Sequence, residues 1–206
     1  MMLGRTLSPS SARNGVTDMA LELLAPAGDM ERLQMSVAYG ADAVYLAGQL
    51  YGMRAFAGNF SREELPRAVE LCHSHGTAVH VTCNTMPRNP ELEALPEYLE
   101  YLQDACVDAL IVGDVGVLAL AKRYAPKVKL HISTQIGVTN HTAAQFWYDQ
   151  GVSRVILARE LTMDEVAEIC VKRPQDLEKR RARADSIITA AKKIPNVTLF
   201  VGLSHK

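Results

Sequence analysis

Short apolar runs alternate with amphipathic helical stretches from Leu21 onward. Each run is about five residues long, is rich in Val, Ile, Leu or Ala, and is bounded by turn or helix signals. The runs cover residues 21–25, 42–46, 78–82, 108–112, 129–133 and 154–158. Such strands are typical of a parallel sheet covered on both faces, and alternation with helices indicates βαβ crossovers. The pattern therefore predicts an α/β protein with six βα units.

Helix-start signals follow several of these predicted strands. Ser61 with Glu64, and Thr162 with Glu165, have the spacing of a capping box. Asp114 and Asn140 are suited to the N-cap position of two further helices. These signals support helices between the apolar runs.

Polar residues gather directly after every predicted strand, for example Gly113-Asp114 and Arg159-Glu160. In a (βα)₈ barrel these connections form one face, which carries the chemistry; helix caps account for part of the polarity. The GxGxxG and GxxxxGK[ST] loops of nucleotide-binding sheets are missing. We therefore predict a parallel (βα)₈ TIM-type barrel that is incomplete. It has six clear units and at most seven strands, the seventh at 197–201, so the sheet should not close.

Composition divides the chain into three parts. Residues 1–20 are rich in Ser, Thr, Gly and Asn and are predicted to be a disordered leader, so that Met19 is an alternative start to Met1. Residues 21–170 form the partial barrel, and residues 171–206 form a basic tail with a helix and a possible strand. No apolar run is long enough for a membrane span and no signal peptide is apparent, which predicts a cytoplasmic protein without membrane contact.

Four cysteines lie far apart, without a CxxC pair, which argues against a zinc ribbon or a redox dithiol. Cys72 and Cys106 are predicted to be core residues on apolar helix faces. Cys83 ends the third strand, where packing is favoured over a role in a pocket. No metal or cofactor site is predicted in this chain.

Several segments resemble the collagenase-like peptidase family, class U32. They are LLAPAGD (23–29), YGADAVYLAG (39–48), RAFAGNFSREEL (54–65), CNTMPRNPELEALPEYLEYL (83–102), HISTQIGVTN (131–140) and RVILAREL (154–161). The resemblance covers Leu21 to about Glu178 and is greatest to the branch that hydroxylates a tRNA uridine in a prephenate-dependent reaction. It implies a barrel fold, with tRNA or a prephenate-like anionic small molecule as partner.

The resemblance ends at about Glu178, after which the sequence departs from the family. Family members continue into a cysteine-bearing stretch that binds an iron–sulfur cluster, and this tail contains no cysteine. We therefore expect a truncated family member that is inactive alone and does not carry the cluster. Open sheet edges would then favour self-association or a partner.

Candidate substrate-binding residues follow the predicted strands. Arg54 and Asn59 lie in a Gly-rich connection, where Arg could bind a carboxylate or anchor the loop by a salt bridge. Arg159 and Glu160 could bind substrate or pair with each other. The side-chain amides of Asn84 and Gln135 could orient a polar ligand or hold the loops in place. The complete set is Arg54, Asn59, Asn84, Gln135, Asn140, Arg159 and Glu160.

The residues themselves do not support a peptidase site. HExxH and GxSxG are missing, and His80 and His131 lie within predicted strands, where structural roles are favoured. Three functions therefore remain as alternatives. They are prephenate-dependent tRNA hydroxylation by the full-length relatives, genuine collagenase-like proteolysis, and a non-catalytic barrel fragment that acts with a partner.

Overall fold

One seven-stranded sheet and the helices around it make up the computed structural model, which describes residues 22–53, 59–171 and 202–204. The strands are β1 (Leu24–Pro26), β2 (Ala43–Leu46), β3 (Ala78–Cys83), β4 (Ala109–Val112), β5 (Lys129–Ile132), β6 (Arg154–Ile156) and β7 (Gly202–Ser204). The helices are α1 (Met30–Ala38), α2 (Glu64–Ser74), α3 (Asn89–Leu92), α4 (Leu95–Asp104), α5 (Val115–Tyr124), α6 (His141–Asp149), α7 (Met163–Val171) and the 3₁₀ turn η1 (Thr134–Ile136).

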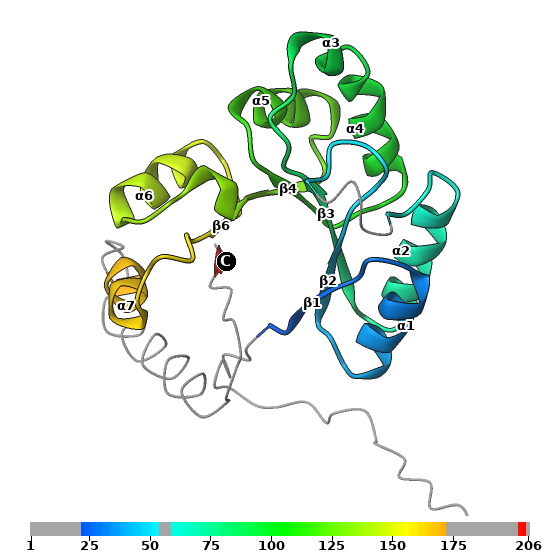
Figure 1. The fold of residues 1–206 in the computed structure, drawn as a ribbon, viewed down its shortest axis with the longest axis horizontal. Coiled ribbons are helices and arrows are strands. Elements are labelled where there is room, and N and C mark those ends of the chain that lie inside the picture. The colour runs from blue at the N-terminus through cyan, green and yellow to red at the C-terminus, as the bar shows by residue number, and fades with distance from the viewer. Residues whose placement is uncertain (1–21, 54–58, 172–201, 205–206) are drawn as a thin grey trace, which may run out of the picture.

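Strands β1 to β6 pair in chain order and are all parallel, so the predicted βα series is confirmed. They curl into a half-barrel with the helices on the outside (Figure 1). The predicted strand at 197–201 lies outside the described residues, as do the leader and nearly all of the basic tail. Strand β7 pairs antiparallel with β6, so it is not a further βα unit. Among the described residues no pairing joins β1 to β6 or β7.

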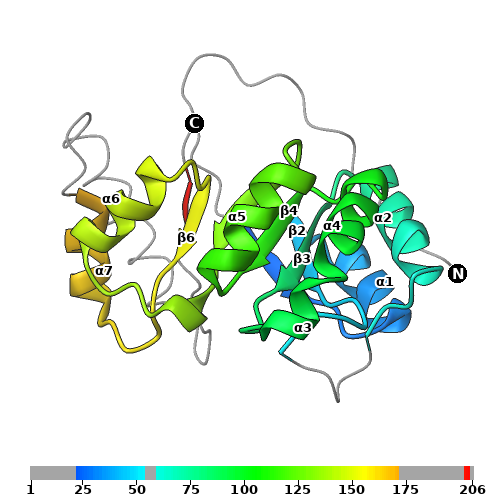
Figure 2. The same ribbon diagram turned by 90° about the horizontal axis from the view of Figure 1, so that it is seen from above.

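The main core lies between the sheet and its outer helices. On β2, β3 and β4 the side chains of Val44, Val79 and Leu110 are fully buried. They face apolar helix positions that include Leu33, Leu65, Leu99, Leu102 and Val117. Figure 2 shows α1 to α5, the helices of the first four units, on one side of the molecule, and α6 and α7 beside β6 on the other. Burial on both faces explains why the strands read as continuous apolar runs.

The predicted helix starts are confirmed by hydrogen bonds. Asp114 Oδ1 accepts from the Val117 amide at 2.9 Å, and Asn140 Oδ1 accepts from the Ala143 amide at 2.9 Å. Both predicted capping boxes are also formed, at Ser61–Glu64 and at Thr162–Glu165. These contacts satisfy backbone donors that a helix leaves free at its first turn.

Four helices end in the same left-handed turn before the next strand. Gly40, Gly76 and Gly151 occupy this position after α1, α2 and α6, and Cys106 occupies it after α4 with a φ of 61°. The prediction that Cys106 packs in the core is therefore wrong, because this residue lies beyond the helix and is exposed. The prediction for Cys72 is confirmed, since its side chain is fully buried.

Candidate functional site

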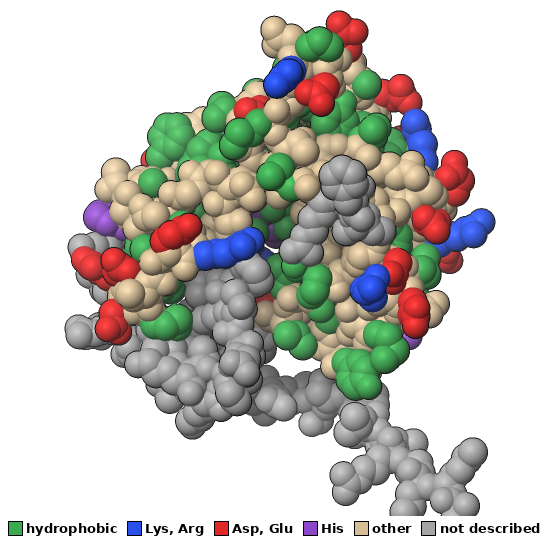
Figure 3. Space-filling model, in the orientation of Figure 1, with side chains coloured by type: hydrophobic (Ala, Val, Ile, Leu, Met, Phe, Trp, Pro, Cys, Tyr) green, Lys and Arg blue, Asp and Glu red, His purple; other side chains and the backbone are tan. Residues whose placement is uncertain are grey.

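A pocket of about 180 Å³ lies at the carboxyl ends of the parallel strands. Side chains from the ends of the strands and from the connections after them form its wall. A space-filling view shows hydrophobic side chains together with a Lys or Arg side chain near the centre of the molecule (Figure 3). The described residues that line it are Leu24, Pro26, Ala27, Gly28, Tyr45, Leu46, Ala47, Met53, Asn59, Thr82, Asn84, Ile111, Ser133, Thr134, Gln135, Ile156 and Arg159. This is the face where (βα)₈ enzymes hold their substrates.

The connections after β2 and β3 are tied together at one side of the pocket. Asn84 Oδ1 accepts a hydrogen bond from the Met53 amide at 3.3 Å. The Phe60 amide donates to the Ala47 carbonyl at 2.9 Å, which holds neighbouring Asn59 beside the end of β2. The Asn84 side chain and the backbone next to Asn59 are thereby fixed at the pocket wall.

The connections after β5 and β6 form the opposite side. Ser133 Oγ accepts from the Gln135 amide at 3.2 Å, which starts the 3₁₀ turn η1 directly after β5. The Ala158 amide donates to the Val138 carbonyl at 2.9 Å and joins the end of β6 to this turn. Arg159 follows at once, so its exposed side chain begins at a fixed point of the pocket rim.

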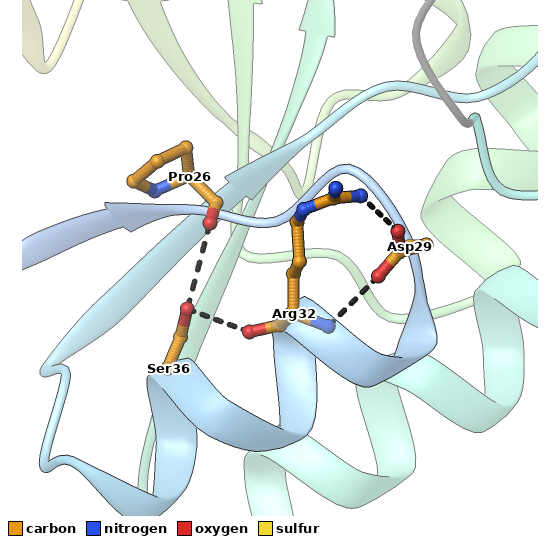
Figure 4. A network of polar contacts seen from close by, with 4 residues as sticks. All are labelled: Pro26, Asp29, Arg32 and Ser36. Atoms are coloured by element: carbon orange, nitrogen blue, oxygen red, sulfur yellow. Dashed lines mark hydrogen bonds and ion pairs between the residues drawn. The ribbon is translucent and has the colours of Figure 1, made fainter.

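Helix α1 is fastened beside the pocket at the end of β1 (Figure 4). Asp29 accepts from the Arg32 amide at 2.8 Å and forms an ion pair with the Arg32 guanidinium. The Ser36 hydroxyl lies 2.9 Å from the Arg32 carbonyl and 3.4 Å from the Pro26 carbonyl. The carboxylate that follows β1 is thus occupied in capping its own helix.

The structure brings four of the seven predicted binding residues together at the pocket: Asn59, Asn84, Gln135 and Arg159. Asn140 caps α6 and Glu160 is exposed; neither lines the pocket. No Arg159–Glu160 ion pair occurs within the described part of the chain. The candidate Arg54 lies outside the described residues.

Sequence reasoning missed Tyr45, Thr82 and Ser133 as pocket residues. Each lies within or directly after a strand whose apolar character concealed it. The alternation of side chains along a strand was the available signal, because it separates residues that face the barrel interior from those that face the helices.

A buried polar cluster lies one layer below the pocket, within the barrel interior. Thr82 and Ser133 line the pocket, and His80 and His131 precede them by two positions on the same faces of β3 and β5. The two imidazole rings meet edge to face with centroids 4.7 Å apart. Burial lowers the pKa of His80 to about 4 and that of His131 to about 2, so both rings are neutral near pH 7.

Arg154 completes this cluster from β6, where it is the register partner of His131. Its guanidinium forms a paired contact with the Glu22 carboxylate, with Nη2 and Oε2 2.6 Å apart. The hydrogen bond from Arg154 lowers the pKa of Glu22. This ion pair joins the segment before β1 to β6, the last parallel strand, across the open side of the sheet.

The cysteines do not gather into a site for the iron–sulfur cluster that the family resemblance implies. Cys72 packs in the core, and Cys106 is exposed in the turn after α4. Cys83 is completely buried, which raises the pKa of its thiol to about 12. Within the described ranges no three His, Cys, Asp or Glu side chains are placed to share a metal ion. A [4Fe–4S] cluster needs four thiolates, so these residues do not fit one.

A peptidase constellation is likewise missing from the described pocket. Its lining contains hydroxyl, amide and guanidinium groups, but no imidazole, thiol or carboxylate. The hydroxyl–imidazole contacts Ser74–His75 and Thr142–His141 join sequence neighbours on exposed helix ends. A nucleophile needs an adjacent base in the pocket, and none of the described lining residues supplies one.

In the described part of the chain, no helix combines the length and apolarity that crossing a bilayer requires.

Comparison with known proteins supports the family resemblance found in the sequence motifs. The family model "Peptidase family U32" matches residues 28–180. "tRNA hydroxylation protein P1" of Bacillus subtilis (strain 168) is 43% identical over 157 residues, which are 76% of this chain and 37% of that protein. A 23S rRNA 5-hydroxycytidine synthase of Escherichia coli (strain K12) is 38% identical over 154 residues, which are 75% of this chain and 23% of that protein. The chain therefore spans less than two fifths of the length of these relatives.

A solved structure supports the fold. The U32 peptidase Mk0906 superposes with a TM-score of 0.63 at 15% sequence identity, covering 93% of this chain and 86% of that one. The family model, the curated relatives and this half-barrel agree with the motifs found in the sequence. The chain belongs to peptidase family U32.

Proposed function

We propose that this chain serves in RNA hydroxylation and that its pocket binds a small anionic metabolite of the prephenate type. The names of two relatives, a tRNA hydroxylation protein and an rRNA 5-hydroxycytidine synthase, support the reaction class. The composition of the pocket supports the ligand class. Genuine proteolysis is the weaker alternative, because the described lining of the pocket contains no nucleophile with an adjacent base.

The observation that carries the proposal is the arrangement of side chains at the pocket rim. Asn59, Asn84, Gln135 and Arg159 come from the connections after four different strands and line one cavity. One of them is cationic, and no Asp or Glu is among the described residues of the lining. A rim with this charge favours a carboxylate over a cationic or purely apolar ligand.

Each group has a defined part in binding. The Arg159 guanidinium offers paired donors to a carboxylate, and the amides of Asn84 and Gln135 orient polar groups of the ligand. Apolar residues of the lining, such as Leu24 and Ile111, exclude water from the body of the ligand. The described residues supply binding and orientation.

The ligand proposal is tested by isothermal titration of the purified chain with prephenate. We expect saturable binding that weakens about 10-fold in Arg159→Gln, because a charge-assisted pair to the carboxylate is lost. Arg123→Gln is the matched control, since Arg123 lies on α5 with its guanidinium over the Tyr124 ring, away from the pocket. Equal affinity in the wild type and Arg159→Gln would contradict the assignment of Arg159.

The reaction class is tested in cells that lack the endogenous tRNA hydroxylation proteins. We expect hydroxylated uridine to return, by mass spectrometry of tRNA nucleosides, when a hybrid carries this chain in place of the matching segment of a relative. The same hybrid with Arg159→Gln should restore less. Cleavage of gelatin by stringently purified chain, with no restored modification, would instead establish the peptidase alternative.

A further inference from the structure

Three buried nitrogen atoms below the pocket have no hydrogen-bond partner among the described residues. They are Nδ1 of His80, Nδ1 of His131 and Nε of Arg154. Both histidines are at least nine-tenths buried, with 5% and 3% of their surface exposed. A buried polar atom left unpaired costs about 1–3 kcal/mol, so three in one cluster indicate a missing polar partner.

The position of the cluster connects it to the pocket. His80 and His131 lie two residues before Thr82 and Ser133, and these two residues line the pocket. Residues two apart on a strand share a face, so the imidazoles form the layer directly below the pocket wall. Arg154 and Ile156 have the same relation on β6, where Ile156 lines the pocket.

The chemistry of the unpaired atoms selects the kind of group that fits. Arg154 Nε carries a proton and can only donate. A neutral imidazole has one donor nitrogen and one acceptor nitrogen, so the cluster offers donors and acceptors together. A hydroxyl group both donates and accepts, whereas a carboxylate only accepts and an ammonium only donates.

The surrounding charges also favour an uncharged group. The charged residues that act on the two rings are Glu22 before β1, Asp108 before β4, Lys129 on β5 and Arg154 on β6. Two are acidic and two are basic, and Arg154 is already paired with Glu22. The cluster therefore has no net charge with which to hold an ion.

We propose that His80, His131 and Arg154 form an inner subsite of the pocket that binds a hydroxyl group of the ligand. In this proposal Arg159 at the polar rim and the apolar residues Leu24 and Ile111 line the pocket. The three buried nitrogens form a hydroxyl-binding end directly below its wall. The ligand class is an acid with an apolar body and a hydroxyl group at the end opposite its carboxylate. This inference rests on the proposed binding of an anionic metabolite at the rim.

The test compares two probes that differ by one terminal hydroxyl, 4-hydroxyphenylpyruvate and phenylpyruvate. Titration calorimetry of the purified wild-type chain should give at least about 10-fold tighter binding of the hydroxylated probe, because phenylpyruvate leaves the buried nitrogens unpaired. His131→Met should reduce this preference to less than about 2-fold while the affinity for phenylpyruvate is kept. His141→Gln, at the exposed start of α6, is the matched control and should retain the full preference.

Imidazole ¹⁵N spectra of the wild-type chain give a second measurement that does not depend on the folding of a variant. Adding 4-hydroxyphenylpyruvate should shift the ring nitrogens of His80 and His131, and phenylpyruvate should leave them in place. Equal affinities for the two probes, or unshifted imidazoles, would overturn the subsite and leave the rim proposal standing. Failure of both these acids and prephenate to bind would overturn both proposals.

Discussion

At the scale of single residues, the buried histidines couple the stability of the protein to pH. Both have a pKa lowered by burial, so the unfolded chain binds more protons than the folded chain at pH values below the ordinary histidine pKa of about 6.5. The stability that depends on neutral rings is complete above that value. It is lost progressively as the pH falls toward the folded pKa values.

Urea denaturation at pH 7.5 and pH 5.5 measures this coupling. Below the ordinary pKa each ring contributes roughly 1.36 kcal/mol per pH unit, and pH 5.5 lies about one unit below it. The unfolding free energy should therefore fall by about 2–3 kcal/mol between the two conditions. In His131→Met the decrease should be about half as large, because only His80 remains. His141→Gln should behave as the wild type, and an equally steep decrease in His131→Met would show that other groups cause it.

Close packing at Gly48 gives a second prediction at this scale. A Cβ at this position would lie 2.3 Å from the Tyr98 hydroxyl oxygen, which is itself buried without a hydrogen-bond partner among the described residues. Gly48→Ala should therefore lower the unfolding free energy by about 1–3 kcal/mol. Tyr98→Phe removes both the clash and the unpaired hydroxyl, so the double variant should regain most of the loss. Additive effects in a thermal-melt cycle would contradict this account.

At the scale of elements, the turn that joins a helix to the next strand recurs along the chain. Gly occupies its left-handed position after α1, α2 and α6, and Cys106 occupies it after α4. The left-handed conformation costs a residue with a Cβ roughly 1–2 kcal/mol, whereas glycine adopts it readily. The exposed thiol compensates for little of this cost by packing.

Cys106→Gly should therefore raise the unfolding free energy by about 1 kcal/mol, measured by urea denaturation. The reverse change at the equivalent position, Gly76→Ala, should lower it by a similar amount, since nothing obstructs the Cβ there and only the backbone conformation is unfavourable. Destabilisation by Cys106→Gly would show that a contact of the thiol stabilises the fold by more than the left-handed conformation costs.

At the scale of the whole molecule, one ion pair spans the open side of the half-barrel. Glu22 precedes β1 and Arg154 begins β6, so the pair links the first and last parallel strands. The lowered pKa of Glu22 means that this contribution is present above its ordinary pKa and is lost as the pH falls through the folded value. The side chain of Glu22 is 39% exposed, and solvent therefore screens part of the interaction.

A double-mutant cycle of Glu22→Gln and Arg154→Gln should give a coupling free energy of about 1 kcal/mol after that discount. The coupling should weaken in 1 M NaCl, because salt screens partly exposed charges. Arg62→Gln and Glu97→Gln, whose ion pair joins two exposed side chains outside the barrel, provide the comparison and should couple less. A coupling near zero would show that the pair does not hold the sheet edges together.

Much of the local structure was evident from the chain itself. The apolar runs predicted all six parallel strands, and the spacing of Ser61 with Glu64 predicted a helix start that the hydrogen bonds confirm. These features depend on neighbours a few residues apart, so their physical cause is written in the sequence. Cys106 was misplaced because its position was assigned from helical periodicity, whereas the helix ends two residues earlier.

The site, by contrast, was decided by the tertiary structure. The sequence placed Asn59, Asn84, Gln135 and Arg159 after different strands, and only the curl of the sheet brings them to one cavity. The same curvature buries His80 beside His131, which are 51 positions apart. Strand register and curvature arise from packing between distant segments, and no short window of sequence contains that information.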